Sequence, residues 1–196
     1  MDFLLAERIP RLARDERRAG WAGFAWGFAE GLFFFIVPDV YVTFATLFSL
    51  RSGVTAWIAS IAGSLVAVTV IFLLTAGGVA YVNFLAAVPG IPWSMLEHVR
   101  LLLGASGLPY TLLLIVGGVP LKVYAGMAFS LGMSLSAVLL WTVFARVVRI
   151  APVFVLAALA HAVCARSIEQ HAARWVALLA SVWFVFYVVY FIRLGW

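Results

Sequence analysis

A stretch of 21 residues from Val54 to Leu74 contains no charged side chain. This length matches the roughly 20 apolar residues that a helix needs to cross a bilayer core about 30 Å thick. The rest of the chain is similar, because 66% of its 196 residues are hydrophobic and only 11% are charged. So few charges cannot cover a soluble globular domain, in which roughly 45–50% of residues are apolar. The sequence therefore excludes a soluble enzyme and a disordered chain, and it predicts one integral membrane domain over residues 21–196.

Residues 1–20 differ from the rest because they are rich in arginine. Leu5, Ile9 and Leu12 fall near one face of a helix. The arginines fill the other face: Arg8, Arg11, Arg14 and Arg18. This pattern is typical of an amphipathic helix at a membrane surface, and the positive-inside rule predicts that it lies on the cytoplasmic side. The net charge of +5 thus indicates orientation in a membrane, and we expect no nucleic-acid partner.

Residues 21–50 form an apolar segment that two acids and a proline interrupt. Glu30 lies inside it, and Pro38 directly precedes Asp39. A straight span would place both carboxylates, and the unpaired amides near the proline, in hydrocarbon at high cost. We therefore predict a re-entrant hairpin, in which two half-helices meet at a turn near Pro38 and return to the cytoplasmic face. Three glycines at four-residue spacing predict close helix packing in the first half-helix: Gly23, Gly27 and Gly31.

The remaining sequence divides into further membrane segments. We predict a span over 54–76, a connector over 79–104, a second re-entrant hairpin over 105–131 with its turn at Pro120, and spans over 135–163 and 174–194.

Two short matches indicate an internal repeat. Pro-Asp-Val-Tyr at 38–41 matches Pro-Leu-Lys-Val-Tyr at 120–124 with one inserted residue, and Phe-Ser-Leu at 48–50 recurs at 129–131. With one crossing between them, the two hairpins would enter from opposite faces. The sequence therefore predicts an all-α fold of two inverted repeats, each a re-entrant hairpin followed by a transmembrane helix.

Two acids are candidates for a role in a working cycle. Glu30 and Asp39 are the only acidic residues between Glu16 and Glu97. A carboxylate kept at membrane depth is costly, and it can pick up and release a proton. Alternatively, each acid is paired with an internal arginine for structural reasons.

Three cations are candidates for anion binding: Lys122, Arg146 and Arg149. The two arginines are three residues apart and so project to the same side of a helix, and guanidinium groups bind phosphate oxygens in a bidentate fork. Three cations near two carboxylates leave a net positive site, suited to a phosphorylated headgroup. Alternatively the five charges form a salt-bridge network, and Arg149, which Pro152 follows, snorkels to an interface.

Known catalytic motifs are absent from the sequence. It contains no G-x-S-x-G, H-E-x-x-H or G-x-x-x-x-G-K-[ST] string, so the hydrolase, zincin and P-loop interpretations have no support. His161 and Cys164 share a helix face, but two ligands do not make a metal site. We expect no catalytic residue, cofactor or metal.

The charged motifs resemble those of the DedA family, also called the VTT-domain or SNARE-associated Golgi protein family. The segment 30–39, E-G-L-F-F-F-I-V-P-D, resembles the family element E-S-S-F-F-P-I-P-P-D/E. The segment 120–123, P-L-K-V, is similar to the P-Y-K-V element of one bacterial branch, where G-R-x-x-R-F lies downstream. Arg146 and Arg149 follow Lys122 by 24 and 27 residues, as in that branch. Non-proline residues replace two family prolines in the first element, and alanine replaces the glycine before the first arginine.

This resemblance covers roughly residues 21–163 and implies a function. Family members are linked to membrane homeostasis and to transport of undecaprenyl phosphate or phospholipids across bilayers, with the acids and arginines essential. We therefore expect a non-enzymatic, flippase-like or scramblase-like lipid transporter, multi-pass in the bacterial cytoplasmic (inner) membrane. Lys122 and Arg146, helped by Arg149, would hold the phosphate of an anionic or polyprenyl lipid, and Glu30 or Asp39 would exchange a proton.

Two other functions stay open at this point. One is a membrane-embedded enzyme that acts on a lipid phosphate, and the other is a structural or assembly protein whose internal charges hold the fold. The lipid, the direction of movement and the oligomeric state, including a homo-oligomer, are left open by the sequence.

Overall fold

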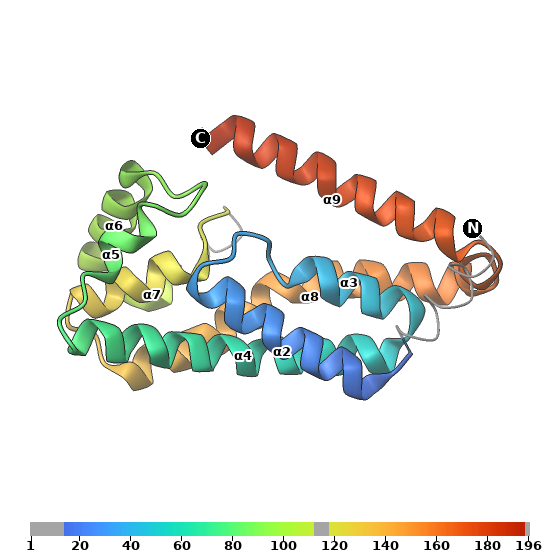
Figure 1. Cartoon of the computed structure of the whole chain (residues 1–196), viewed down its shortest axis with the longest axis horizontal. Helices are drawn as coiled ribbons and strands as arrows, with labels where there is room; N and C mark the ends of the chain where they lie inside the picture. The colour runs from blue at the N-terminus through green and yellow to red at the C-terminus, as the bar shows by residue number, and fades with distance from the viewer. Residues whose placement is uncertain (1–13, 112–117, 195–196) are drawn as a thin grey trace.

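The computed structural model describes residues 14–111 and 118–194, and all regular structure in these ranges is helical (Figure 1). The helices are α2 (Glu16–Leu32), α3 (Asp39–Phe48), α4 (Leu50–Ala76), α5 (Tyr81–Leu85), α6 (Trp93–Thr111), α7 (Leu121–Ser130), α8 (Leu135–Gln170) and α9 (Ala172–Leu194). Among them, three are long and apolar enough to cross a membrane: α4, α8 and α9. The described helices agree with the predicted all-α membrane class.

Three helices, α2, α4 and α8, begin at polar N-caps that the local sequence supplies. Asp15 accepts a hydrogen bond from the Arg18 N–H at the start of α2. Ser49 and Ser134 play the same part for α4 and α8. Each side chain satisfies one of the backbone donors that a helix start leaves unpaired.

Helix α2 packs directly on α4 through glycines. A Cβ on Gly27 would overlap the carbonyl oxygen of Ser60, and a Cβ on Gly63 would overlap that of Phe24. The two backbones therefore approach as closely as small residues permit. The close packing predicted for Gly23, Gly27 and Gly31 is confirmed.

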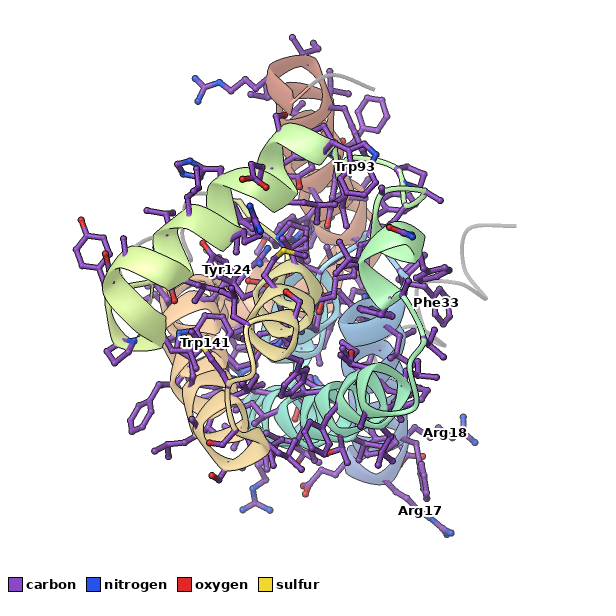
Figure 2. All side chains as sticks on the ribbon, turned by 90° about the vertical axis from the view of Figure 1, so that its left-hand side faces the viewer. Arg17, Arg18, Phe33, Trp93, Tyr124 and Trp141 are labelled. Carbon is purple, nitrogen blue, oxygen red and sulfur yellow. The ribbon has the colours of Figure 1, made fainter. Side chains whose placement is uncertain are left out.

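Helix α7 lies at the centre of the main apolar cluster. Its residues 121–129 are all buried, and α7 contacts α4, α5, α6 and α8. In Figure 2 Tyr124 lies among the surrounding helices, whereas Arg17 and Arg18 point away from the helical body. A cation on α7 is thus inside the protein, while the N-terminal arginines of α2 remain outside.

Prolines stand at the beginning of both short helices that follow a turn. Pro38 is the N-cap residue of α3 and Pro120 that of α7, and each helix has 10 residues. The start of α2 and the end of α3 lie at the same end of the molecule (Figure 1). Helix α9 runs along one side of the body and passes over the turn between α2 and α3 (Figure 1).

Several helix boundaries differ from the predicted ones. Helix α2 begins at Glu16, so the predicted division at residue 20 falls inside a helix. Helix α6 runs through the predicted limit of the connector at residue 104, with a kink at Gly107 where φ is 71°. Helix α4 begins ahead of its predicted start, and α8 continues beyond Val163 to Gln170. Hydropathy marks the apolar part of a helix, whereas caps decide where its hydrogen bonding ends. The rest of the predicted amphipathic helix, residues 1–13, and residues 112–117 of the second predicted hairpin lie outside the described residues.

Candidate functional site

A buried ion pair joins α2 to α8. The guanidinium of Arg146 donates from Nη2 to Glu30 Oε2, and its Nε donates to Ser64 Oγ over 3.0 Å. Glu30 and Arg146 are each 1% exposed. Ser64 in turn donates to the carbonyl oxygen of Ser60 within α4 over 2.8 Å. Because both charges are removed from solvent and each has a partner, this pair links three helices at their crossing.

Lys122 joins the start of α7 to the end of α2. Its Nζ donates to the carbonyl oxygens of Glu30 (3.0 Å) and Phe34 (2.9 Å), and the residue is 1% exposed. The last carbonyls of a helix carry partial negative charge, so a cation there is stabilising. Lys122 therefore holds together the two turns that carry Pro38 and Pro120.

Arg149 and Asp39 form a looser pair at the edge of a cavity. Arg149 Nε lies 3.7 Å from Asp39 Oδ2. Among the described residues, neither Asp39 Oδ2 nor Arg149 Nη1 has a hydrogen-bond partner. The side chains are 14% exposed for Arg149 and 5% for Asp39. The cavity has a volume of about 280 Å³, and residues from both turns and from α3, α8 and α9 line it: Val37, Asp39, Gly118, Arg149, Val153, Val182, Trp183 and Phe186.

The structure thus brings the five predicted charges into one region but gives them different surroundings. Lys122 and Arg146 use their donors on internal acceptors. This part of the cluster has the form of the salt-bridge alternative. Arg149 lines a cavity and keeps one guanidinium nitrogen, Nη1, without a hydrogen-bond partner among the described residues.

Helix α9 contributes residues that sequence reasoning missed. Tyr187 Oη accepts a hydrogen bond from the Val37 N–H over 2.7 Å, and Tyr190 Oη donates to the Gly118 carbonyl oxygen over 3.1 Å. One helix therefore touches both turns at the cavity. Tyrosines near a chain end are typical of the interface belt of a membrane protein, so no signal in the sequence separated these two from ordinary belt residues.

Ser64 is the other site residue that sequence reasoning missed. It lies within the charge-free run of α4, where a serine is normally a small packing residue. Its contact with Arg146 depends on the register between α4 and α8, which the sequence does not contain. No set of three or more His, Cys, Asp or Glu side chains in the described part of the chain could hold a metal ion, and His161 Nδ1 lies 2.9 Å from the Leu47 carbonyl oxygen.

Comparison with known protein families, characterised proteins and solved structures finds no match to this chain. The likeness to the DedA family therefore consists of the motifs at 30–39, 120–123 and 146–149. Their charged residues lie within one region of the fold, although 116 positions separate Glu30 from Arg146. A functional assignment has to come from the chemistry of this region.

Proposed function

We propose that this chain is a transporter of the DedA family that moves a lipid bearing a phosphate, such as undecaprenyl phosphate or a phospholipid, across the bacterial cytoplasmic membrane. One observation carries the proposal. Arg149 lines a cavity formed by both turns, and its buried Nη1 has no hydrogen-bond partner among the described residues. A guanidinium fork matches phosphate oxygens better than any other side chain. The five clustered side chains sum to one net positive charge, which favours an anion.

In this proposal the two ion pairs have different roles. The Glu30–Arg146 pair and Lys122 form a fixed frame, because Arg146 donates to Glu30 Oε2 and Ser64 and Lys122 donates to two backbone carbonyls, although Glu30 Oε1 has no hydrogen-bond partner among the described residues. The Arg149–Asp39 pair is the exchangeable part, since its closest contact is 3.7 Å. A phosphate that binds Arg149 takes the place of the Asp39 carboxylate.

Displacement of Asp39 supplies a route to proton coupling. Asp39 is 3% exposed, and a buried carboxylate without a cation is costly to keep charged. In the proposed cycle one of the two acids, Glu30 or Asp39, exchanges the coupled proton.

The proposed membrane arrangement has two inverted repeats. Its support is that two ten-residue helices, α3 and α7, both begin at a proline and both carry a charge in the first turn. Each is followed by a helix of spanning length, α4 or α8. The outward-pointing Arg17 and Arg18 (Figure 2) support a cytoplasmic position for the start of α2, in line with the positive-inside rule. The first turn would then enter the membrane from that side.

The test is leaflet equilibration in liposomes. Purified protein is reconstituted with a fluorescent phosphate-bearing lipid in one leaflet, and the wild type is compared with Arg149→Gln at equal protein insertion. Arg100→Gln is the control, because this arginine is exposed on α6 and pairs only with Glu97 at 3.1 Å.

We expect the wild type and Arg100→Gln to accelerate equilibration equally. Arg149→Gln loses a charged hydrogen bond to the ligand, worth about 1.5–3 kcal/mol, so transport should fall by roughly tenfold or more. No acceleration by folded wild-type protein, with any anionic lipid, would remove the proposal and favour an assembly role. Unchanged transport by Arg149→Gln would remove Arg149 from the site.

A further inference from the structure

An apolar groove runs between α9 and the body of the protein. It lies against α3 at Thr43 and Leu47, against α8 at Ala157 and Ala160, and against α9 at Leu178. Its volume is about 250 Å³. We call it the α9 groove.

The α9 groove adjoins the cavity at Arg149 and Asp39. Three residues line both spaces: Val153, Val182 and Trp183. Trp183 stands between them and donates from Nε1 to Thr43 Oγ1 over 3.0 Å. One end of the apolar groove thus lies next to the cavity that Arg149 lines.

The dimensions of the groove limit what can occupy it. From Arg149 to Ala160 helix α8 rises about 16 Å at 1.5 Å per residue, which is close to half of a 30 Å bilayer core. A hydrocarbon chain of one leaflet spans the same depth, so its length fits this space.

We propose that the α9 groove binds one hydrocarbon chain of an amphiphile whose anionic head lies against Arg149. The apolar lining suits the chain, and charge complementarity at one end orients it. Helix α9 then forms the outer wall of the lipid site, hydrogen-bonded through Tyr187 and Tyr190 to the two turns that border the head. The inference rests on the proposed function for the identity of the ligand as a lipid, but its evidence is the shape and charge of the groove.

Photolabelling tests the position of the hydrocarbon chain. Wild-type protein is reconstituted in vesicles that contain an anionic phospholipid with a diazirine at the end of one acyl chain, and the labelled residues are mapped by mass spectrometry. We expect labels to concentrate on Ala157, Ala160 and Leu178. The outward-facing Val155 and Leu159, which are 51% and 56% exposed, report contact with bulk lipid. Equal labelling of the groove and these outer residues would overturn the inference.

A matched pair of substitutions tests whether lipid transport uses the α9 groove. Ala157→Phe fills the groove, whereas Val155→Phe adds a similar bulk to the same helix on a face outside the groove. In the leaflet assay Ala157→Phe should slow transport about tenfold, the effect of displacing about two methylene groups from a binding site. Val155→Phe should leave the rate unchanged.

The two proposals fail in different ways. The groove inference is overturned if the wild type transports lipid, Ala157→Phe leaves the rate unchanged and the labelling is uniform. In that case the transporter proposal still holds. Concentrated labelling of the groove in a protein that transports no lipid supports the groove and overturns the transporter.

Discussion

Replacement of Arg146 by methionine should destabilise the protein strongly. Arg146 is 1% exposed and is the only described side chain that pairs with the Glu30 carboxylate. Methionine preserves the length and apolar stem of the side chain but leaves the buried Glu30 carboxylate without its ion-pair partner. The change therefore isolates the ion pair from simple loss of volume.

The size of the expected destabilisation follows from the burial of the Glu30–Arg146 pair. Breaking a fully buried pair by removing one partner costs about 3–5 kcal/mol, because the remaining charge has no compensation. For a chain of this size, 1 kcal/mol corresponds to about 2–4 °C in Tm. Arg146→Met should thus lower the midpoint of thermal unfolding in detergent by about 6–20 °C.

A double substitution separates charge from packing. Glu30→Met combined with Arg146→Met removes both charges together, and such a replacement is often neutral or stabilising. We expect its Tm to return close to that of the wild type. Arg166→Met, at an exposed position of α8, is the matched control and should leave Tm unchanged.

Thermal unfolding followed by intrinsic tryptophan fluorescence provides the assay. The reasoning is refuted if Arg146→Met unfolds at the wild-type temperature. It is also refuted if the double variant is as unstable as the single one, because the cost would then arise from packing and not from an unpaired charge.

Three further predictions concern the contacts around this pair. Gly27→Ala should lower Tm because the added Cβ overlaps the α4 backbone. Gly104→Ala is the control, since a Cβ there meets no heavy atom within 4 Å, and equal effects on Tm would contradict the close α2–α4 contact. Tyr187→Phe removes the acceptor of the Val37 N–H, so hydrogen exchange over residues 33–38 should speed up roughly tenfold, since an unsatisfied buried donor costs about 1–3 kcal/mol; unchanged exchange would argue against this bond. Lys122 is the only lysine of the sequence and is 1% exposed, so amine reagents should modify its side chain only after denaturation in SDS, and an adduct on Lys122 in folded protein would contradict the structure.

The pairing of the internal charges was only partly predictable. Charges at membrane depth are costly without partners, so the sequence could predict that Glu30 and Asp39 meet some of the three cations. It could not choose Arg146 for Glu30 and Arg149 for Asp39. That choice depends on the rotation of α8 about its axis relative to α2 and α3, which side-chain packing across distant segments decides.

The helix boundaries show a similar limit. Apolar length predicted α4 and α9 to within four residues and the start of α8 at Leu135, but α8 continues seven residues beyond its predicted end. Apolar length did not predict α6, whose residues Glu97, His98 and Arg100 indicated an exposed connector. Those side chains are carried on one exposed face, while Val99 and Leu103 on the other face are buried against the core.

The most direct test of the account is the depth of the first turn in the bilayer. Two single-cysteine variants, Phe33→Cys and Trp21→Cys, are made in a Cys164→Ser background, spin-labelled and reconstituted. Both positions are exposed, at 52% and 68%, and they lie about 18 Å apart along α2 at 1.5 Å per residue. Accessibility to oxygen, relative to a polar nickel reagent, gives the depth of each label.

We predict that the label at Phe33 lies near the bilayer centre and the label at Trp21 near the headgroups, because α2 carries Glu30 into the membrane. If both labels lie at headgroup depth, α2 rests on the surface. The charged cluster would then be outside the hydrocarbon core, and the account of a lipid-phosphate site within the membrane would be wrong.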